Sequence, residues 1–307
     1  LEDPTKCKVL HSCRQDLEIF YYTRGKLPEN IFDTQVAAML CGLGDTMSLE
    51  SLVALACNVN MDKTQRRSDW LKRPLNKAQL DYAAMDVRYL HRIHKKLNEH
   101  LVQQKRMEWL AEETKPLLDP SLYTPNLSKL FLKLNLDTNN KTVHQTAMAL
   151  VKAREVVAQK LNVPRNRVID DSIIRVLAKR DLSEDKVWHD FIGDQSREST
   201  NQLIAEYRSG AGELLEIPPL KKNRSIPHLA LQALMLLMAM SAESYGISSS
   251  LIASKSDLVA LYHDKDQADT DLLKGWRYEV YGQKALGLIK GEMHIGFEGQ
   301  ELKLISL

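Results

Sequence analysis

Apolar residues recur at helical spacing along most of the chain, and short β-branched runs occur only near its start. Residues 1–113 mix such runs with helical patterns and end in a long charged helix that we expect to extend through His91 to Trp109. Three prolines then interrupt the pattern within residues 116–126. The first segment therefore predicts an α/β domain over residues 1–113.

The rest of the chain predicts helices alone. Residues 127–208 carry three helical patterns, over residues 143–161, over residues 172–180 and through Leu203 to Arg208. A stretch rich in Gly, Pro and charge follows at residues 209–227, and the last module, over residues 222–307, is helical again with a Gly-rich end that suits a short hairpin or a frayed terminus. The two modules are similar in length and pattern, which indicates two copies of one helical unit.

Composition supports a globular protein. The 307 residues are 44% hydrophobic and 27% charged, with a net charge of +2. The longest apolar run, residues 229–240, is too short for a membrane span and predicts a buried helix. The four cysteines lie in the first fifth of the chain without a CxxC pair, and no signal-peptide pattern opens it, so we expect reduced thiols and a cytoplasmic protein.

One helical stretch carries candidate chemistry. Tyr82 and Asp86 are four residues apart and therefore share a helix face. A phenol beside a carboxylate can orient water next to a metal ion that the carboxylate holds, which suits in-line attack on a phosphodiester. Spacing alone also fits a solvated pair on an exposed helix.

The blocks around this pair resemble a known family. SDWLKRPLNKAQLDYAAMDVRYL at residues 68–90 is similar to the third exonuclease motif of ribonuclease D, and KVLHSCRQDLEIF at residues 8–20 resembles its second motif, whose aspartate is Asp16. IFDTQVAAMLCG at residues 31–42 matches the strand and helix between them. The helical modules resemble the paired HRDC domains of that family. The resemblance implies an RNase H-like exonuclease fold with an incomplete sheet, followed by two all-α helical modules.

The same resemblance implies a 3′-5′ exoribonuclease that acts on tRNA precursors and other structured RNA 3′ ends, releases 5′-mononucleotides and needs no obligate protein partner. Asp16 and Asp86 correspond to ligands of two Mg²⁺ or Mn²⁺ ions about 4 Å apart, and Tyr82 to the residue that orients the attacking water. The family uses four carboxylates, two of them from a D-x-E motif on a first strand that this sequence does not show. We therefore expect the chain, which opens at Leu1, to be a fragment with half of the metal ligands.

Positive charge is concentrated in two short regions of the chain. Between positions 63 and 73 the chain has five basic residues and one acidic residue, and this group precedes the Tyr82 helix. We therefore expect it to contact substrate, with the main candidates Lys63, Arg66, Arg67 and Arg73. Residues 152–180 hold eight basic side chains against three acidic ones, a pattern equally typical of a phosphate-binding surface and of a solvated face.

Several alternatives stay open on sequence grounds. Asp33 lies between a strand and a helix, where a cap is favoured over a metal ligand. His91 and His94 have zinc-ligand spacing but no further ligands nearby in sequence, and His11 is expected to pack beneath the site rather than to act as a base. A DNA-directed exonuclease and a non-catalytic nucleic-acid-binding protein remain the competing functions.

Overall fold

The computed structural model describes residues 3–62, 64–192, 197–210, 212–219 and 224–307, and the chain divides into two compact units. Unit 1 combines Leu1–Tyr123 with Arg224–Leu307, and unit 2 is Thr124–Asn223. The last segment of the sequence therefore belongs with the first one, an arrangement that the linear order of three segments did not predict.

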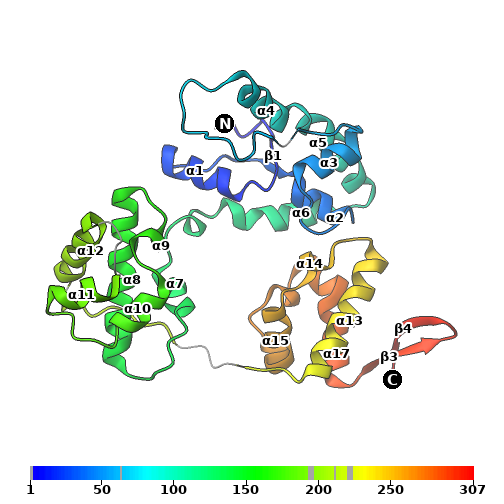
Figure 1. Cartoon of the computed structure of the whole chain (residues 1–307). Coiled ribbons are helices and arrows are strands. Elements are labelled where there is room, and N and C mark those ends of the chain that lie inside the picture. Colours follow the sequence, from blue (N-terminus) through cyan, green and yellow to red (C-terminus); the bar gives the residue numbers. More distant parts are fainter. Residues whose placement is uncertain (1–2, 63, 193–196, 211, 220–223) are drawn as a thin grey trace. The chain divides into compact units, whose positions relative to one another are not determined.

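The first segment of unit 1 is built on two short parallel strands (Figure 1). Lys8 pairs with Ile31 and Leu10 with Asp33; the second strand leads directly into a helix, and three residues separate the first strand from its helix. Both predicted strand-to-helix blocks are therefore present. The elements of this segment are β1 (Lys8–Leu10), α1 (Arg14–Arg24), β2 (Ile31–Asp33), α2 (Thr34–Leu40), α3 (Leu49–Cys57), α4 (Lys77–Arg88), α5 (Leu90–Gln103) and α6 (Met107–Thr114).

The long helix expected through Trp109 is in fact two helices. Lys105 adopts a left-handed conformation at φ 56°, which ends α5. The interruption turns Arg106 inward, where only 7% of it is exposed. Its guanidinium donates to the carbonyls of Leu40 at 2.7 Å and Gly246 at 3.4 Å, and also to that of Tyr245. The break thus serves to cap the C-terminal ends of two helices with one buried side chain.

The C-terminal part of unit 1 is helical up to residue 290 and then forms a β-hairpin, so this module is not purely α-helical. In the helix expected to be buried, Leu231, Leu234 and Leu237 are buried, whereas Met235 and Leu236 on the other side are about 40% exposed. The main elements are α13 (His228–Tyr245), α14 (Ser249–Ile252), α15 (Lys255–Asp264), α16 (Gly275–Arg277), a π-helical turn (Tyr278–Gly282), α17 (Gln283–Lys290), β3 (Met293–Glu298) and β4 (Glu301–Ser306).

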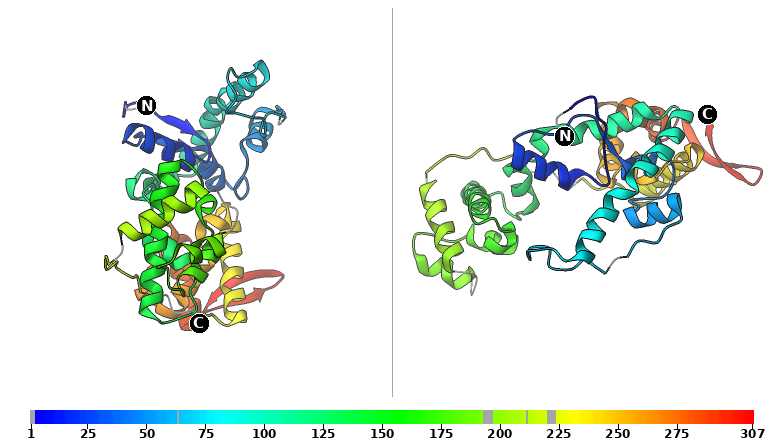
Figure 2. Two further views of the ribbon diagram at one scale, coloured as in Figure 1. Left: turned by 60° about the vertical axis from the view of Figure 1, so that its left-hand side comes forward. Right: turned by 90° about the horizontal axis from the view of Figure 1, so that it is seen from above.

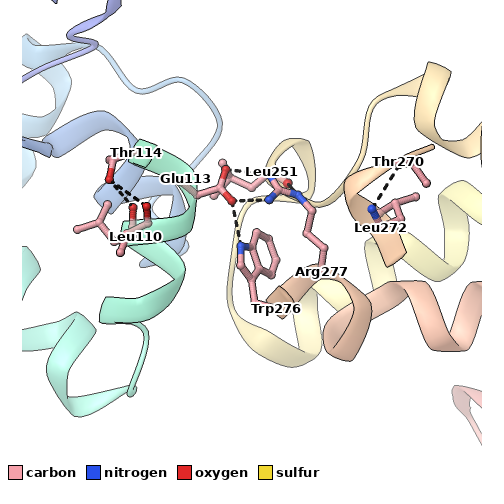
Figure 3. Close-up of polar contacts among 9 residues, drawn as sticks. Leu110, Glu113, Thr114, Leu251, Thr270, Leu272, Trp276 and Arg277 are labelled. Atoms are coloured by element: carbon pink, nitrogen blue, oxygen red, sulfur yellow. Dashed lines mark hydrogen bonds and ion pairs between the residues drawn. The ribbon is translucent and has the colours of Figure 1, made fainter. Parts of the chain in front are cut away.

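The two parts of unit 1 share one hydrophobic core, which runs from Phe32 to Leu286. Polar contacts reinforce the junction (Figure 3): the Glu113 carboxylate accepts from Trp276 Nε1 at 2.9 Å and from both terminal nitrogens of Arg277. The rings of Trp109 and Trp276 stack at 5.0 Å. The C-terminal helices are therefore part of the scaffold that supports α2 and α6.

Unit 2 is helical and closes its own core around Trp188, Phe131 and the long helix α8. The three predicted patterns correspond to α8 (Lys141–Leu161), α10 (Asp171–Leu177) and α12 (Arg197–Ser209). Helix α10 ends at Leu177, before the expected end at residue 180. The helices are α7 (Leu127–Lys133), α8 (Lys141–Leu161), α9 (Arg165–Val168), α10 (Asp171–Leu177), α11 (Asp185–Ile192) and α12 (Arg197–Ser209).

Candidate active site

Asp33 organises the two strand-to-helix turns. It is 2% exposed, and its carboxylate accepts from the backbone N–H groups of Gln35 (2.8 Å) and Val36 (3.4 Å) at the start of α2. It also accepts from Ser12 at 3.0 Å and Cys13 at 2.8 Å, just before α1. The cap expected from the sequence is confirmed, and these four bonds occupy the carboxylate that a metal would need.

Asp16 lies in the first turn of α1, the helix that Asp33 anchors. Its side chain is exposed and makes no ion pair within the described part of the chain. Burial of the carboxyl by its surroundings, and then the nearby charge of Asp33, raise the pKa of Asp16 above its usual value. A cation bound at this carboxylate would relieve both effects.

The helix with the Tyr82 and Asp86 pair begins with a capping box. Asn76 Oδ1 accepts from the Gln79 N–H at 2.8 Å, and Gln79 Oε1 accepts from the Asn76 N–H at 3.0 Å. The Gln79 amide also donates to Ser68 Oγ (3.1 Å) and to the carbonyl of Asp69 (3.0 Å), which fixes the preceding loop. That loop places the Trp70 ring 5.9 Å from the ring of Tyr82.

A third acidic residue accompanies the predicted pair. Burial, then Asp86 and then Glu50 raise the pKa of Tyr82, while burial and then Glu50 raise that of Asp86. Glu50 lies in the first turn of α3, two positions after the N-cap Ser48. The structure thus brings together Tyr82, Asp86 and Glu50.

Glu50 was missed at the level of sequence. An acidic residue two positions after a serine is ordinary helix-start chemistry, and nothing in the local pattern indicates that Glu50 comes near the Tyr82 and Asp86 pair. Its effect on that pair depends on the tertiary fold, in which both α3 and α4 pack against α5.

The charges of Asp33 and Glu50 both act on His11. It follows β1, and its Nδ1 lies 2.9 Å from Thr34 Oγ1. Burial lowers the pKa of His11, and the carboxylates of Asp33 and Glu50 oppose that shift. The packing role expected for this histidine agrees with its half-buried position and its bond to Thr34.

The basic loop is placed next to the same helix. Arg66 is exposed and close enough to Tyr82 to lower its pKa against the larger effect of burial. Arg67 is also exposed, and Arg73 Nη1 donates to the carbonyls of Trp70 at 2.7 Å and Lys72 at 3.0 Å. Lys63 lies outside the described residues.

Four of the eight basic side chains in residues 152–180 form ion pairs within unit 2. Lys152 pairs with Glu213, Arg154 with Asp171, Lys160 with Glu206 and Arg165 with Glu155. These ion pairs favour the solvated-face interpretation of residues 152–180 over a phosphate-binding one.

The predicted site residues offer oxygen ligands that suit a hard cation, but they are few. Asp16, Asp86 and Tyr82 offer oxygen atoms, the ligands that Mg²⁺ and Mn²⁺ prefer. Within the residues that the structure describes, no three His, Cys, Asp or Glu side chains are grouped closely enough to hold a metal ion. The zinc possibility at His91 and His94 gains no support, since the His94 ring packs edge-on against Phe32 at 4.5 Å.

The predicted site is on the surface rather than in an enclosed pocket. Two cavities of about 730 and 600 Å³ are lined by other residues, the first by α13 and β4 and the second by β2, α5 and α6. Asp16 is exposed, and Tyr82 and Asp86 are half-buried. Such a site is accessible to the end of a polymer.

In the part of the chain that the structure describes, none of the helices is long and apolar enough to cross a bilayer.

Comparison with known proteins identifies the family. The 3′-5′ exonuclease family model matches residues 1–102. Ribonuclease D of Granulibacter bethesdensis is 37% identical over 100% of this chain and 80% of its own length, and ribonuclease D of Gluconacetobacter diazotrophicus is 36% identical over 99% and 79%. The crystal structure of Escherichia coli RNase D, described as an exoribonuclease involved in structured RNA processing, matches with a TM-score of 0.75 at 25% identity over 95% of this chain and 81% of that one. The chain therefore belongs to the ribonuclease D family, and a hydrolase of the 3′-5′ exoribonuclease type is favoured over a DNA-directed nuclease or a non-catalytic binding protein.

Proposed function

We propose that this protein removes nucleotides from the 3′ ends of tRNA precursors and other structured RNAs and releases 5′-mononucleotides in the cytoplasm. The observation that carries the proposal is the grouping of Tyr82, Asp86 and Glu50 beside an exposed basic loop. In this arrangement the Tyr82 hydroxyl orients a water molecule toward the scissile phosphate. Arg66, Arg67, Arg73 and Lys63 hold the RNA backbone.

Asp16 and Asp86 are proposed to hold two Mg²⁺ or Mn²⁺ ions. Both carboxyls have a raised pKa, because neighbouring atoms displace part of their water and another carboxylate lies near each, although the Asp16 side chain as a whole is exposed. A divalent cation would therefore favour their charged forms. The ions, when bound, supply the charge that stabilises the attacking and leaving oxygens. Asp33 is not assigned as a ligand because backbone N–H groups occupy it.

Two carboxylates neutralise only half of the charge of two divalent ions, so further ligands are needed. Among the described residues, β1 pairs with β2 alone, which leaves its other edge open to a strand. Val9 and Leu10 on β1 are half-buried, as expected for a strand with incomplete cover. We propose that a strand with a D-x-E motif pairs with this edge and adds two carboxylates.

The helical regions are proposed to be HRDC domains, one over residues 127–208 and the other over residues 222–307. The resemblance of their sequences supports this assignment. In the first, the ion pairs of α8 argue that any contact with RNA is weak or uses other side chains. The second is joined to the nuclease segment by a shared core and would act as part of its scaffold. No obligate protein partner is needed for hydrolysis.

A 5′-labelled RNA with a free 3′ hydroxyl tests the proposal. With Mg²⁺, protein expressed from the complete reading frame should shorten this RNA from its 3′ end, and Asp86→Asn should nearly abolish the reaction. Tyr82→Phe should retain some activity, because loss of water orientation costs a factor of about 10² to 10⁴. Asp81→Asn is the matched control, since Asp81 is an exposed aspartate on the same helix and is none of the proposed ligands.

The outcomes separate the alternatives. Equal activity of Asp86→Asn and the unmodified protein would remove Asp86 from the site. Faster shortening of a DNA strand of the same sequence would favour a DNA-directed enzyme, and RNA binding without metal-dependent shortening would favour a binding protein. The 307-residue chain alone should release no nucleotide, because half of the proposed ligand set is absent from it.

A further inference from the structure

The C-terminal hairpin has an open edge. Strands β3 and β4 pair only with each other among the described residues. In Figures 1 and 2 the tip of the hairpin projects beyond α13 and α17, whereas Ile295 and Leu304 pack against the core of unit 1. An isolated two-stranded sheet is marginally stable, and its unpaired N–H and C=O groups can pair with a further strand.

The register shows which groups face outward. The Leu307 N–H donates to the Glu292 carbonyl at 3.1 Å, so residues 292 and 307 form a hydrogen-bonded pair. Hydrogen-bonded and non-bonded pairs alternate in antiparallel strands. The N–H and C=O groups of Ile295 and Phe297 therefore point to the open edge of β3, while those of His294, Gly296 and Glu298 point to β4.

The side chains along this edge are unusual for a solvated strand. Ile295 and Phe297 lie on one face of the hairpin, and 73% of Phe297 is exposed. His294 and Glu298 lie on the other face, separated by Gly296. Natural edge strands are usually protected by charge, proline or a bulge, and β3 has no proline.

We propose that β3 pairs antiparallel with β3 of a second copy of this chain, about a two-fold axis at Gly296. This register sets Phe297 opposite Ile295 of the second copy, so each exposed Phe297 ring gains an apolar neighbour beside the core that Ile295 contacts. It also sets His294 opposite Glu298 of the second copy, where the imidazole adds a polar partner to a carboxylate that pairs with Lys303 of its own hairpin at 2.6 Å, and the symmetry makes this pair twice. The four strands form one continuous sheet.

Other registers are less favourable. A shift by one residue would set the apolar face against the polar face. A two-fold axis at Ile295 would place Glu292 opposite Glu298 of the second copy, and like charges directly opposite are destabilising. The side-chain pattern of the strand therefore favours the two-fold axis at Gly296 over these two registers. The proposal rests on the hairpin alone and does not depend on the nuclease activity.

A cysteine at the two-fold axis tests the register. The Cα atoms of the two copies of residue 296 would lie about 4.5 Å apart as a non-hydrogen-bonded pair, within the range for a disulfide. A Cβ at Gly296 would approach the Ile305 side-chain tip at 3.2 Å, which a flexible side chain can accommodate. Under oxidation, Gly296→Cys should yield a disulfide-linked dimer that a reductant dissolves.

Glu292→Cys is the matched control, because Glu292 is exposed and takes no part in the proposed side-chain pairs. In the proposed register, residue 292 of one copy is eight residues out of line with residue 292 of the other, about 26 Å away, which is too far for a disulfide. It should cross-link no more than the unmodified chain, whose own four cysteines set the background. Equal cross-linking of the two variants, or none with Gly296→Cys, would overturn the proposal.

Sedimentation of the full chain over a range of concentrations tests the edge. Phe297→Pro removes an outward N–H but no bond within the hairpin, and symmetry makes the loss twofold, so the dissociation constant should rise about 30-fold, or about 2 kcal/mol. Leu302→Pro makes the same change at the outer edge of β4 and should leave the dimer intact. Association abolished by Leu302→Pro and kept with Phe297→Pro would refute the pairing, as would a monomer at every concentration of the unmodified chain.

Discussion

The junction between Glu113 and Arg277 should contribute strongly to the stability of unit 1. The side chains are 10% and 20% exposed, so water screens them poorly. Arg277→Met removes the cation at similar volume and leaves the Glu113 carboxylate with the Trp276 indole N–H as its donor. Breaking a buried ion pair by removing one partner costs about 3 to 5 kcal/mol. We expect a loss in this range in the free energy of unfolding of unit 1.

Hydrogen exchange measured by mass spectrometry can assign this loss to one unit. The slowest amides of α6 and α17 should exchange faster in Arg277→Met, while those of α8 in unit 2 should be unchanged. Lys152→Met is the matched control because the side chains of the Lys152–Glu213 pair are 38% and 49% exposed, and such pairs contribute about 0 to 1 kcal/mol. Equal effects of the two substitutions would refute the claim that burial makes the Arg277 pair strong.

Three further predictions concern the site and the units. With divalent metal removed, Asp86→Asn should raise the urea midpoint at neutral pH and leave it unchanged well below pH 3.8. The reason is that folding raises the pKa of Asp86, so the charged carboxylate destabilises the folded protein once the pH rises above the ordinary pKa of aspartate. A lower urea midpoint of Asp86→Asn at neutral pH would contradict this. Neutralising Arg66 and Arg67 should weaken RNA binding and reduce the slope of log affinity against log salt by about 0.7 for each phosphate contact that is lost. The control Lys265→Gln with Lys290→Gln, which removes two positive charges elsewhere, should leave that slope unchanged. Equal slopes for the two double variants would assign the loop to a solvated face. Unit 2 expressed alone should unfold cooperatively, but the C-terminal part of unit 1 alone should not, because its core is shared; circular dichroism during urea unfolding of each piece distinguishes these cases.

The sequence predicted the features whose causes are local. Asp33 as a cap, the strand-to-helix blocks at β1 and β2, and the long helix α8 all follow from short-range patterns that the structure confirms. The break between α5 and α6 was not predicted, because nothing in the helical periodicity favours a left-handed lysine. The reason for that break lies far away, in the carbonyls that Arg106 reaches on α2 and α13.

Long-range partners explain what sequence reasoning could not supply. Glu113 and Arg277 are 164 residues apart, and each alone resembles an ordinary charged position on a helix surface. Glu50 likewise resembles an ordinary helix-start residue, although in the folded chain its charge raises the pKa of Tyr82. In both cases the residue type is visible in the sequence, but its energetic role depends on which other charge becomes buried beside it. Because the strength of an electrostatic interaction depends on burial and distance, the same glutamate contributes little on an exposed helix and several kcal/mol at a closed junction.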